Sequence, residues 1–391
     1  MLNLSALFYT EEEGQPCFLS NLNLSDWERS SIREARTEVR RTLKRNVPRI
    51  YKEKGYDGVP EPRFFTQGSW AYKTLNGPSQ VPQQADIDDG CYLPIGFLSM
   101  TKRPKVAANV FFEVVLEALE PLTKERGWPI ATKPTCIRIE ISSTAHLDLP
   151  LYAIPDDEFE TLAKAALTAD FSDALSEEQE RDLWEKLPTE KVMLAHRDLG
   201  WLHSDPRPIK DWFLDQVGVK GEQFRRVVRY LKAWRDWNWD EGGPSSILLM
   251  AAAAPLFERM VRREDEALLN VVRQMPLRLR QGVLNPVNPT ESFTERLRRS
   301  NKEKDLLEEA AEKFQEFSNN LSATLAAGNA SQGCTWMRQM VGGRFPDRPD
   351  MVKVTPAAAA AAGASASIAA AIASSPAMAG PEEIPDRTRA G

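Results

Sequence analysis

The chain has 391 residues, of which 42% are hydrophobic and 27% are charged, and its formal net charge is −6. This length suffices for one large domain or two fused ones with a sizeable core. The proportion of hydrophobic to charged residues excludes collagen, coiled coil and disorder over the whole chain. The acidic charge argues against a protein that clamps DNA or RNA over a long footprint, because such proteins are usually basic.

The cysteines, the histidines and the N-terminal residues exclude further classes of protein. The four cysteines are scattered without a CxxC pair, which argues against a structural zinc site and fits a reducing compartment. The N-terminus has no basic region and no run of 18 apolar residues occurs, so we expect a cytoplasmic protein without a signal peptide or membrane span. No GxxxxGK[ST] motif occurs, which excludes a P-loop NTPase. With only three histidines, any metal chemistry must rest on carboxylates.

The first predicted element is a long amphipathic helix. Ser25 and Glu28 have the spacing of a capping box, which marks a helix start. An apolar stripe with helical spacing follows at Ile32, Ala35, Val39, Leu43 and Val47. Pro60 and Pro62 end this pattern.

Strands and helices alternate after the prolines. Residues 63–66, 86–93, 135–141 and 145–152 are predicted strands, and residues 104–125 are a predicted helix. Gly68 and Ser69 are predicted to form a turn. The alternation favours an α/β or α+β lobe over residues 1–155, which includes the long N-terminal helix.

The rest of the chain is predicted to be helical and to end in a tail. Residues 156–190, 224–236 and three or four segments within 245–325 have helical patterns, so residues 156–345 are expected to form an all-α lobe. From Thr355 the sequence is rich in Ala, Ser, Gly and Pro, which indicates a disordered tail. The predicted domains are therefore residues 1–155, residues 156–345 and a flexible tail over residues 346–391.

Three acidic residues form the densest chemical signal. Asp86 and Asp88 lie two apart on a predicted strand and therefore point to the same face, and Asp148 lies on a later strand. Converging carboxylates are hard ligands that suit Mg²⁺ or Mn²⁺, and two such ions activate a hydroxyl and neutralise pyrophosphate. Gly68 and Ser69 supply close backbone approach and donors for phosphate oxygens. A lone DxD is also common on solvated edges, whereas an EF-hand is excluded because Phe97 stands at the position of the bidentate glutamate.

This ordered set resembles the polymerase-β-type nucleotidyltransferase superfamily. Four longer motifs resemble the cGAS/DncV-like nucleotidyltransferases (CD-NTases); they are TQGSWAYKTLNGPSQVPQQADIDDGCYLP, TAHLDLPLYAIPDDEF, WLHSDPRPIKDWF and RYLKAWRDWNWDEGGPSSILLMAA. The likeness runs from about Arg63 to Ala253 and fades after about Val283.

The resemblance implies a bilobal, polymerase-β-like fold with the active site in a nucleotide cleft that the helical lobe closes. It implies a cyclic dinucleotide synthase that uses two Mg²⁺ or Mn²⁺ ions, joins two nucleotides and closes the ring, releasing two pyrophosphates. The expected product is cyclic GMP-AMP from ATP and GTP. The family also implies the signal-generating role in a bacterial anti-phage (CBASS) system, in which the product acts on an effector.

Roles for individual residues follow from the same resemblance. Asp86, Asp88 and Asp148 would be catalytic and hold the metals, and Tyr72 would stack on a base. Residues expected to contact the donor nucleotide and its phosphates are Gln67, Gly68, Ser69, Lys232, Ser245 and Ser246. Residues expected to face the acceptor nucleotide are Arg138, Ser204 and Asp205.

Each of these residues also has a plain structural interpretation. Lys232 lies beside the apolar stripe of its helix, where an ordinary surface lysine would also lie. Ser245 would also cap a helix, and Tyr72 would also fit in a core. His146, next to the third acid, is expected to be structural, because Mg²⁺ prefers oxygen ligands.

Two further features concern regulation and attachment. Basic residues lie along roughly one face of the first helix at Arg33, Arg36, Arg40 and Lys44, and Arg63 follows later. In a relative within the family a basic pocket on the side opposite the active site binds a folate-like inhibitor, so the resemblance makes Arg36, Arg40 and Arg63 candidates for such a pocket; a solvated helix face is the alternative. Relatives encoded with E1/E2-like enzymes are conjugated through a C-terminal glycine, and Gly391 ends this chain. A chance terminal glycine is the alternative.

Two other functions share parts of this evidence. A transferase that adds nucleotides to RNA or to a small acceptor would use the same acids, but the acidic charge argues against RNA. A catalytically inactive nucleotide-binding conjugation scaffold is the third hypothesis, although all three acids are present. The sequence leaves open which bases are joined, and whether the linkage is 3′,3′ or 3′,2′.

Overall fold

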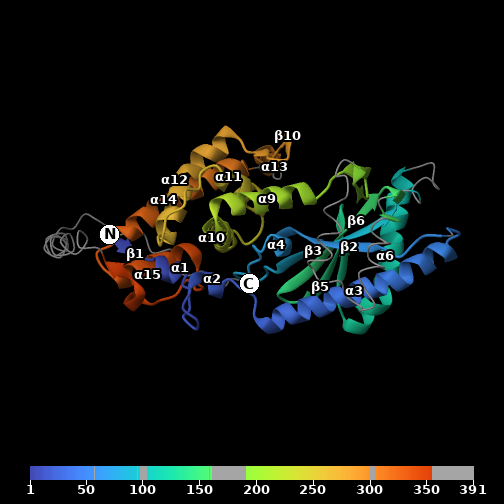
Figure 1. The fold of residues 1–391 in the computed structure, drawn as a ribbon, viewed down its shortest axis with the longest axis horizontal. Coiled ribbons are helices and arrows are strands. Elements are labelled where there is room, and N and C mark those ends of the chain that lie inside the picture. Colours follow the sequence, from blue (N-terminus) through green and yellow to red (C-terminus); the bar gives the residue numbers. More distant parts are fainter. Residues whose placement is uncertain are drawn as a thin grey trace.

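The computed structural model describes residues 1–56, 58–94, 96, 104–157, 159–160, 191–299 and 304–354. Figure 1 shows two parts, a sheet accompanied by two long helices and a cluster of shorter helices. The tail predicted from Thr355, Gly391 and most of the acidic helix predicted over residues 156–190 lie outside the described residues. Within the described ranges, no helix is long and apolar enough to cross a membrane.

The described elements are short in the N-terminal segment and longer afterwards. The helices are α1 (Ser5–Phe8), α2 (Phe18–Asn21), α3 (Asp26–Glu53), α4 (Gly68–Ala71), α6 (Pro104–Arg126), α9 (Arg207–Lys220), α10 (Glu222–Asn238), α11 (Ser246–Ala253), α12 (Glu264–Gln281), α13 (Phe293–Arg299), α14 (Leu306–Leu325), α15 (Ala330–Val341) and the 3-10 helix η2 (Pro349–Met351). The strands are β1 (Leu2–Asn3), β2 (Arg63–Gln67), β3 (Ala85–Pro94), β4 (Ile130–Thr132), β5 (Cys136–Ser142), β6 (Ala145–Ile154), β7 (Met193–His196), β8 (Gly200–His203), β9 (Leu284–Asn285), β10 (Asn288–Ser292) and β11 (Lys353–Val354).

Seven strands form one mixed sheet with the main order β2-β3-β6-β5-β4. β3 and β6 run parallel, and the other pairs described in this sheet are antiparallel. This confirms the predicted α+β architecture. The prediction of an all-α second half is wrong for β7 and β8, because the end of β6 continues past β5 and pairs with β7. The hairpin of β9 and β10 is a second pair of strands in that half.

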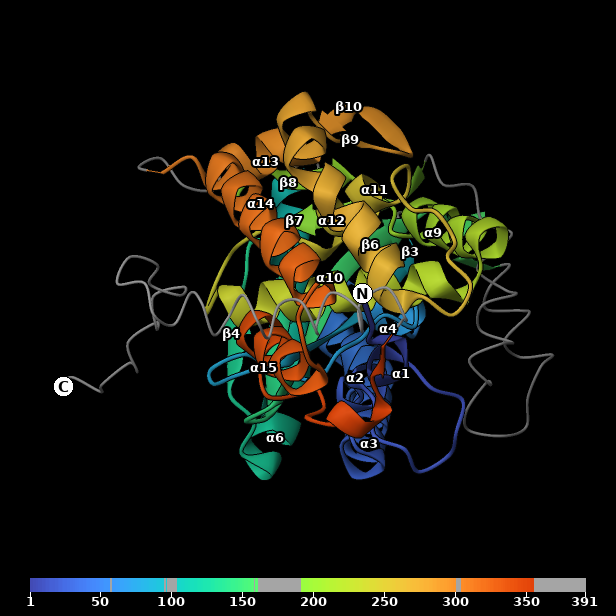
Figure 2. The ribbon, with the colours of Figure 1, turned by 90° about the vertical axis from the view of Figure 1, so that its left-hand side faces the viewer.

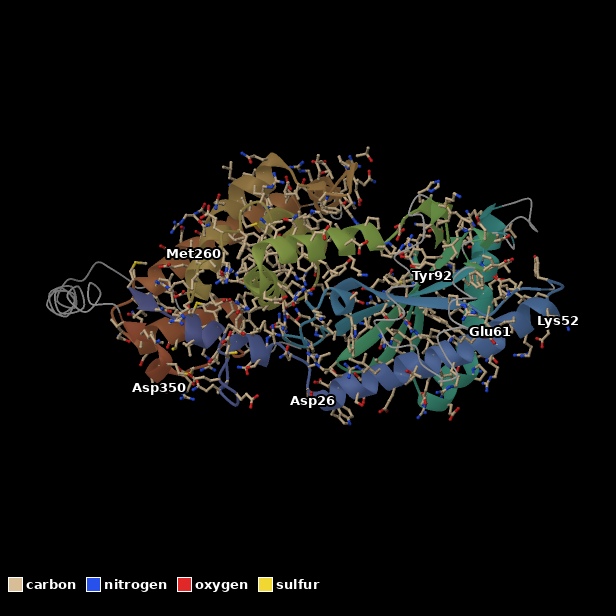
Figure 3. The ribbon with its side chains drawn as sticks, viewed as in Figure 1. Asp26, Lys52, Glu61, Tyr92, Met260 and Asp350 are labelled. Carbon is tan, nitrogen blue, oxygen red and sulfur yellow. The ribbon has the colours of Figure 1, made fainter. Side chains whose placement is uncertain are left out.

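The helices α3 and α6 lie side by side and cover one face of the sheet (Figure 2). The predicted capping box is present, with Ser25 N donating to Glu28 Oε2 (2.8 Å) and Glu28 N donating to Ser25 Oγ (3.2 Å). The predicted apolar stripe of α3 is buried, and all of its members except Ala35 belong to the same core as Ile87 and Leu147 of the sheet. Because side chains alternate along a strand, this burial turns Asp86 and Asp88 toward the opposite face. The positions of Asp26 and Lys52 in Figure 3 mark the two ends of α3.

The helices from α9 onward pack around a second, aromatic core. Trp234 stacks on Phe317, with ring centroids 4.9 Å apart. The N-terminal segment joins this core rather than the sheet, since Phe8 lies 5.1 Å from the ring of Tyr230 and β1 pairs with β11.

Two short segments therefore pack across the predicted domain limits. Residues 2–22 belong to the helical core, although they precede the limit at residue 155. Residues 349–354 form η2 and β11, although they follow the limit at residue 345. The sequence does not predict where these two segments pack, because pairing between distant segments leaves no local sequence pattern.

Candidate active site

The sheet register brings the three predicted acids together. In the parallel pair of β3 and β6, Asp86 lies opposite His146 and Asp88 lies opposite Asp148. In the antiparallel pair of β5 and β6, Arg138 lies opposite Asp148. The predicted triad therefore occupies two neighbouring strands on the face of the sheet that α3 and α6 leave uncovered.

Two of the three acids each contact a neighbouring basic side chain. His146 Nε2 lies 3.0 Å from Asp86 Oδ1, and Arg138 donates from Nε and Nη2 to the two oxygens of Asp148 at 2.7 and 2.6 Å. Partial loss of solvent in the cleft raises the pKa of Asp86. The hydrogen bond and charge of His146, together with the charges of Arg138 and Lys232, outweigh this effect, so the net pKa lies below its ordinary value.

The third acid, Asp88, lacks such support. Among the described residues no group donates a hydrogen bond to its carboxylate, and its pKa is raised well above the ordinary value by burial and then by the charges of Asp86 and Asp148. An unsatisfied carboxylate beside two others is an arrangement that a divalent cation stabilises. Possible ligand atoms of Asp86, His146 and Asp148 also lie within 4.8 Å of one another. The carboxylate oxygens gathered here are ligands that fit a hard divalent cation such as Mg²⁺ or Mn²⁺.

Gly68 is required by the close approach of its backbone to Asp88. Its φ is +64°, and a Cβ built on it would lie 1.9 Å from Asp88 Oδ2. The predicted Gly-Ser turn is in fact the first turn of α4, which begins directly after β2. The next residue, Ser69, donates from Oγ to the carbonyl oxygen of Asp86 at 3.2 Å. The strand-to-helix junction therefore lies against the acids.

A pocket of about 520 Å³ separates the sheet from the helices at this point. Its lining residues come from α4, the loop after it, β3, α10, the segment between α10 and α11, and α11: Gly68, Ser69, Tyr72, Thr74, Leu75, Asn76, Gly77, Pro78, Gln83, Gln84, Asp86, Asp88, Lys232, Arg235, Asp236, Trp239, Asp240, Glu241, Gly242, Ser245, Ser246, Ile247 and Met250. Most of the predicted nucleotide-binding residues thus share one cavity with two of the three acids. Its volume lies within the range of small-molecule sites.

Lys232 lines this pocket from α10 but is almost fully buried, with 4% of its surface exposed. Its Nζ donates to the carbonyl oxygen of Thr74 at 2.7 Å. Burial, and next the charge of Arg235, lower the pKa of Lys232 to about 7. The lysine is therefore a buried cleft residue whose charge changes near neutral pH.

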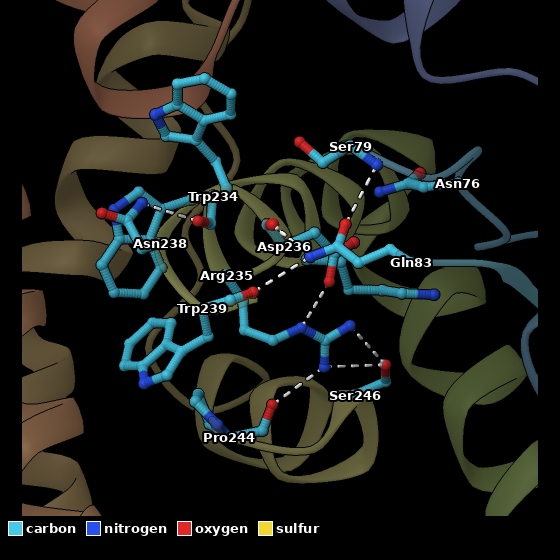
Figure 4. Close-up of polar contacts among 12 residues, drawn as sticks. Asn76, Ser79, Gln83, Trp234, Arg235, Asp236, Asn238, Trp239, Pro244 and Ser246 are labelled. Atoms are coloured by element: carbon cyan, nitrogen blue, oxygen red, sulfur yellow. Dashed lines mark hydrogen bonds and ion pairs between the residues drawn. The ribbon is translucent and has the colours of Figure 1, made fainter. Parts of the chain in front are cut away.

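Arg235 is a pocket residue that the sequence analysis missed (Figure 4). It donates from Nε to Asp236 Oδ1 (2.6 Å) and from Nη1 to the carbonyl oxygen of Pro244 (2.9 Å), and both Nη atoms lie 3.4 Å from Ser246 Oγ. Ser245 caps α11, with Leu248 N donating to its Oγ at 3.3 Å. Arg235 lies three residues after Lys232, which places both side chains on one face of α10. This spacing could have identified Arg235 as a pocket residue from the sequence.

The loop after α4 closes the pocket against the end of α10 (Figure 4). Gln83 Nε2 donates to the carbonyl oxygens of Asp236 (2.5 Å) and Trp239 (3.0 Å), and its Oε1 accepts from Ser79 N (3.1 Å). Gln80 Nε2 also donates to the Asp236 carbonyl, at 3.2 Å. These amides satisfy carbonyl groups that the end of a helix leaves free.

Other predicted site residues lie at or beyond the rim of this pocket. Tyr72 lines it and is buried, and its ring centroid lies 5.8 Å from that of Phe213. Gln67 is buried and donates from Nε2 to Tyr152 Oη at 3.2 Å, rather than lining the pocket. Asp205 pairs with Arg207, and Ser204 is exposed.

A second, basic pocket of about 410 Å³ lies on the other side of α4. Its lining residues are Arg29, Arg33, Phe65, Thr66, Trp70, Ala71, Lys73, Leu75, Lys210 and Arg229. The predicted candidates lie beside it: Arg36 donates to Thr66 Oγ1 (2.9 Å), Arg40 pairs with Asp89, and Arg63 has a buried Nε. Arg36 and Arg40 thus bind residues of β2 and β3 rather than line the pocket. The positive charges of the pocket come from Arg29, Arg33, Lys73, Lys210 and Arg229.

Comparison with known proteins supports the same class of enzyme. Residues 62–152 match the model for "Cyclic GMP-AMP synthase DncV-like, nucleotidyltransferase domain", and residues 221–353 match "Cyclic GMP-AMP synthase, C-terminal domain". A cyclic GMP-AMP synthase of Vibrio cholerae is 33% identical over 320 residues, which cover 76% of this chain and 71% of the relative. One of Escherichia coli is 37% identical over 239 residues, which cover 58% and 55%.

Solved structures agree with these matches. The Vibrio cholerae di-nucleotide cyclase DncV in complex with GTP and 5MTHFGLU2 matches with a TM-score of 0.75 at 27% identity, covering 90% of this chain and 99% of that chain. DncV in complex with the linear intermediate 5′ pppA(3′,5′)pG matches with a TM-score of 0.74 at 26% identity and the same coverage.

Fold, acids and cleft together define a nucleotidyltransferase. The chain belongs to the DncV-like family of cyclic GMP-AMP synthases, as its motifs indicated, and is a cyclic dinucleotide synthase.

Nucleotide affinity is expected to fall as pH rises, because Lys232 loses its proton near neutrality. With a pKa of about 7 in the free enzyme, and a triphosphate that requires the charged form, the KM for nucleotide should rise by up to about 50-fold between pH 7 and pH 9. Lys232→Arg keeps its charge over this range and should flatten the profile. Initial rates at limiting nucleotide across this range measure the effect; equally steep profiles for both proteins would contradict it.

Proposed function

We propose that the enzyme makes cyclic GMP-AMP from ATP and GTP by two sequential nucleotidyl transfers that each release pyrophosphate. The observation that carries this proposal is the convergence of Asp86, Asp88 and Asp148 beside a nucleotide-sized pocket, with the glycine of the strand-to-helix junction against Asp88. Relatives are named cyclic GMP-AMP synthases. DncV has been solved with a pppA(3′,5′)pG intermediate, and a variant of it with ATP and GTP.

Asp86, Asp88 and Asp148 are proposed to hold two Mg²⁺ or Mn²⁺ ions. When bound, such ions lower the pKa of the attacking ribose hydroxyl and neutralise the leaving pyrophosphate. The bidentate contact from Arg138 keeps the carboxylate of Asp148 in one orientation. Because the hydroxyl must lie beside Asp148 to react, this contact also orients the acceptor side of the site.

The remaining site residues are proposed to bind the two nucleotides. Gly68 and Ser69 present the first turn of α4 to the donor phosphates, and Lys232 supplies a positive charge from the opposite wall. Ser245 and Ser246, at the start of α11, extend the phosphate site, and Tyr72 offers a ring to a base. Gln67 is proposed to complete the donor site, and Ser204 and Asp205 are proposed to complete the site toward the acceptor.

Product analysis tests the choice of substrates. The protein is incubated with Mg²⁺ and each nucleoside triphosphate, singly and in all pairs. The masses of the products are measured by mass spectrometry before and after digestion by a 3′–5′-specific nuclease. ATP with GTP should give the mass of cyclic GMP-AMP as the main product, and the digestion reports the linkage. A main product with two identical bases or with a pyrimidine would contradict the proposal.

The product is proposed to be the signal of an anti-phage (CBASS) system, acting on an effector in the cytoplasm. The family membership supports this role. Cells that express the enzyme with the effector encoded beside it should resist phage, and cells that carry an Asp86→Asn, Asp88→Asn enzyme should not. Equal resistance in both would contradict a signalling role.

The basic pocket is proposed to bind a folate-like inhibitor. Arg33 lies over the ring of Trp70 (5.7 Å from its centroid), and DncV has been solved with 5MTHFGLU2. Leu75 lines both pockets, while Lys73 lines the basic one and Thr74 the catalytic one. The loop after α4 is therefore a shared wall through which a ligand on one side can shift residues on the other.

Inhibition by 5MTHFGLU2 should weaken by about tenfold or more in Arg33→Glu, because one charge of the pocket is reversed. Arg41→Glu, at an exposed position of α3, changes the net charge equally and should be inhibited like the wild type. Dose–response curves of product formation measure both. Equal inhibition of all three proteins would contradict this pocket as the inhibitor site.

The C-terminal glycine is proposed to be a conjugation point for E1/E2-like enzymes. Residues after Thr355 contain few large apolar side chains, so truncation there should leave synthesis within about twofold of wild type. Gly391→Glu should also preserve synthesis but abolish covalent adducts formed with E1/E2-like partners from its own genome. Denaturing gels detect the adducts; loss of synthesis on truncation, or adducts that survive Gly391→Glu, would contradict the proposal.

A further inference from the structure

His146 lies in direct contact with Asp86 but has no role in the function described so far. Its buried side chain is 7% exposed, and its Nε2 is 3.0 Å from Asp86 Oδ1 and 4.0 Å from Asp148 Oδ1. The Asp86 side chain, in contrast, is 52% exposed. Among the described residues, His146 is the side chain that hydrogen-bonds to this carboxylate.

Gln84 fixes the orientation of the His146 ring. Its Nε2 donates to the carbonyl oxygen of Ser142 at 3.1 Å, which directs its Oε1 toward His146 Nδ1 at 2.9 Å. Since an amide oxygen only accepts, Nδ1 carries a proton and donates. Nε2 then faces the carboxylate of Asp86 at hydrogen-bonding distance. A chain of hydrogen bonds therefore links the backbone at the end of β5 to the first acid of β3.

We propose that Gln84 and His146 are positioning residues that hold the carboxylate of Asp86 in its metal-binding orientation. This inference rests on the proposed metal site and extends it to two residues outside the acidic triad. The two sides of the site then match, because Arg138 holds Asp148 as His146 holds Asp86. In the described part of the chain Asp88 has no such donor, and the backbone of Gly68 lies close to its carboxylate.

The geometry favours positioning over ligation by His146. The ring nitrogen that faces the site is already hydrogen-bonded to Asp86, and Mg²⁺ prefers oxygen ligands to imidazole. Partners that orient metal ligands usually change metal affinity or activity by about 10- to 100-fold when removed. Loss of Gln84 or His146 should therefore weaken metal binding without removing any ligand.

The first test measures Mn²⁺ binding to the full-length protein without nucleotide, from the electron paramagnetic resonance signal of free Mn²⁺. Gln84→Ala should raise the Kd for Mn²⁺ by about tenfold or more. Gln80→Ala removes the same side chain from the same loop, at a position that bonds to the end of α10, and should leave this Kd unchanged. Thermal melting confirms that both variants are folded.

The second test separates positioning from ligation and from a merely structural role. His146→Ala should weaken Mn²⁺ binding like Gln84→Ala, and His146→Gln, which retains a donor, should restore part of the affinity. Nitrogen coupling to Mn²⁺ in pulsed spectra of the wild type would show that His146 is itself a ligand and would overturn the proposal. Wild-type affinity in both Gln84→Ala and His146→Ala would overturn it while leaving the metal site intact. Absence of Mn²⁺ binding by the wild type would overturn the metal site and this inference together.

Discussion

Replacement of Asp86 and Asp88 by asparagine should abolish cyclic dinucleotide synthesis, with a loss of about 1,000-fold or more, because two of the three proposed metal-binding carboxylates are removed. The fold should persist. Asp88 lies beside two other acids that raise its pKa, so removal of charge relieves repulsion and should keep or raise the melting temperature in the absence of metal. Product formation by mass spectrometry and thermal melting measure the two effects.

A matched control separates the site from a general effect of charge. Glu11→Gln with Glu13→Gln removes two exposed acids with the same spacing and should leave synthesis at the wild-type rate. If the Asp86→Asn, Asp88→Asn protein retained even a tenth of wild-type synthesis, the assignment of the acids would be wrong.

Gly68→Ala should reduce synthesis by about 100-fold or more while costing only about 1–2 kcal/mol of stability through its left-handed backbone. The reason is steric. An added Cβ would lie 1.9 Å from Asp88 Oδ2, so the carboxylate must rotate away from its neighbours. Steady-state rates and chemical denaturation of the same preparations give the two quantities.

Gly127→Ala is the control for the backbone component. Gly127 also has a positive φ (+65°), close to that of Gly68, but an added Cβ would meet nothing within 4 Å. It should lose similar stability and keep wild-type synthesis. Equal losses of synthesis in the two variants would show that backbone strain, and not the contact with Asp88, explains the effect of Gly68→Ala.

Local periodicity is the part of this fold that the sequence reveals. The stripe of α3 follows the helical repeat, and Asp86 and Asp88 follow the two-residue repeat of a strand, so both could be placed without a structure. Gln84, two residues before Asp86, follows the same repeat and was overlooked because an amide attracts less attention than an acid.

Contacts between segments that are distant in the sequence are the part of the structure that could not be predicted. Arg138 reaches Asp148 only through the register of β5 and β6, and nothing local specifies that register. The basic pocket combines Arg33 of α3 with Lys210 and Arg229 of the helical part. A helix-face argument could include Arg33, but not the two cations that lie far away in the sequence. Lys232 was placed on the correct helix, but its burial and its bond to Thr74 depend on a loop more than 150 residues earlier in the chain.

The most direct test of the account is whether one active site performs both transfers and closes the ring. The wild-type protein is supplied with ATP, GTP and Mg²⁺, and pyrophosphate release is compared with the amount of product that resists phosphatase. The account predicts two pyrophosphates for each phosphatase-resistant molecule, with a linear triphosphate intermediate that appears first and is then consumed. A product that stays sensitive to phosphatase, or nucleotides added to an RNA or small acceptor, would contradict it.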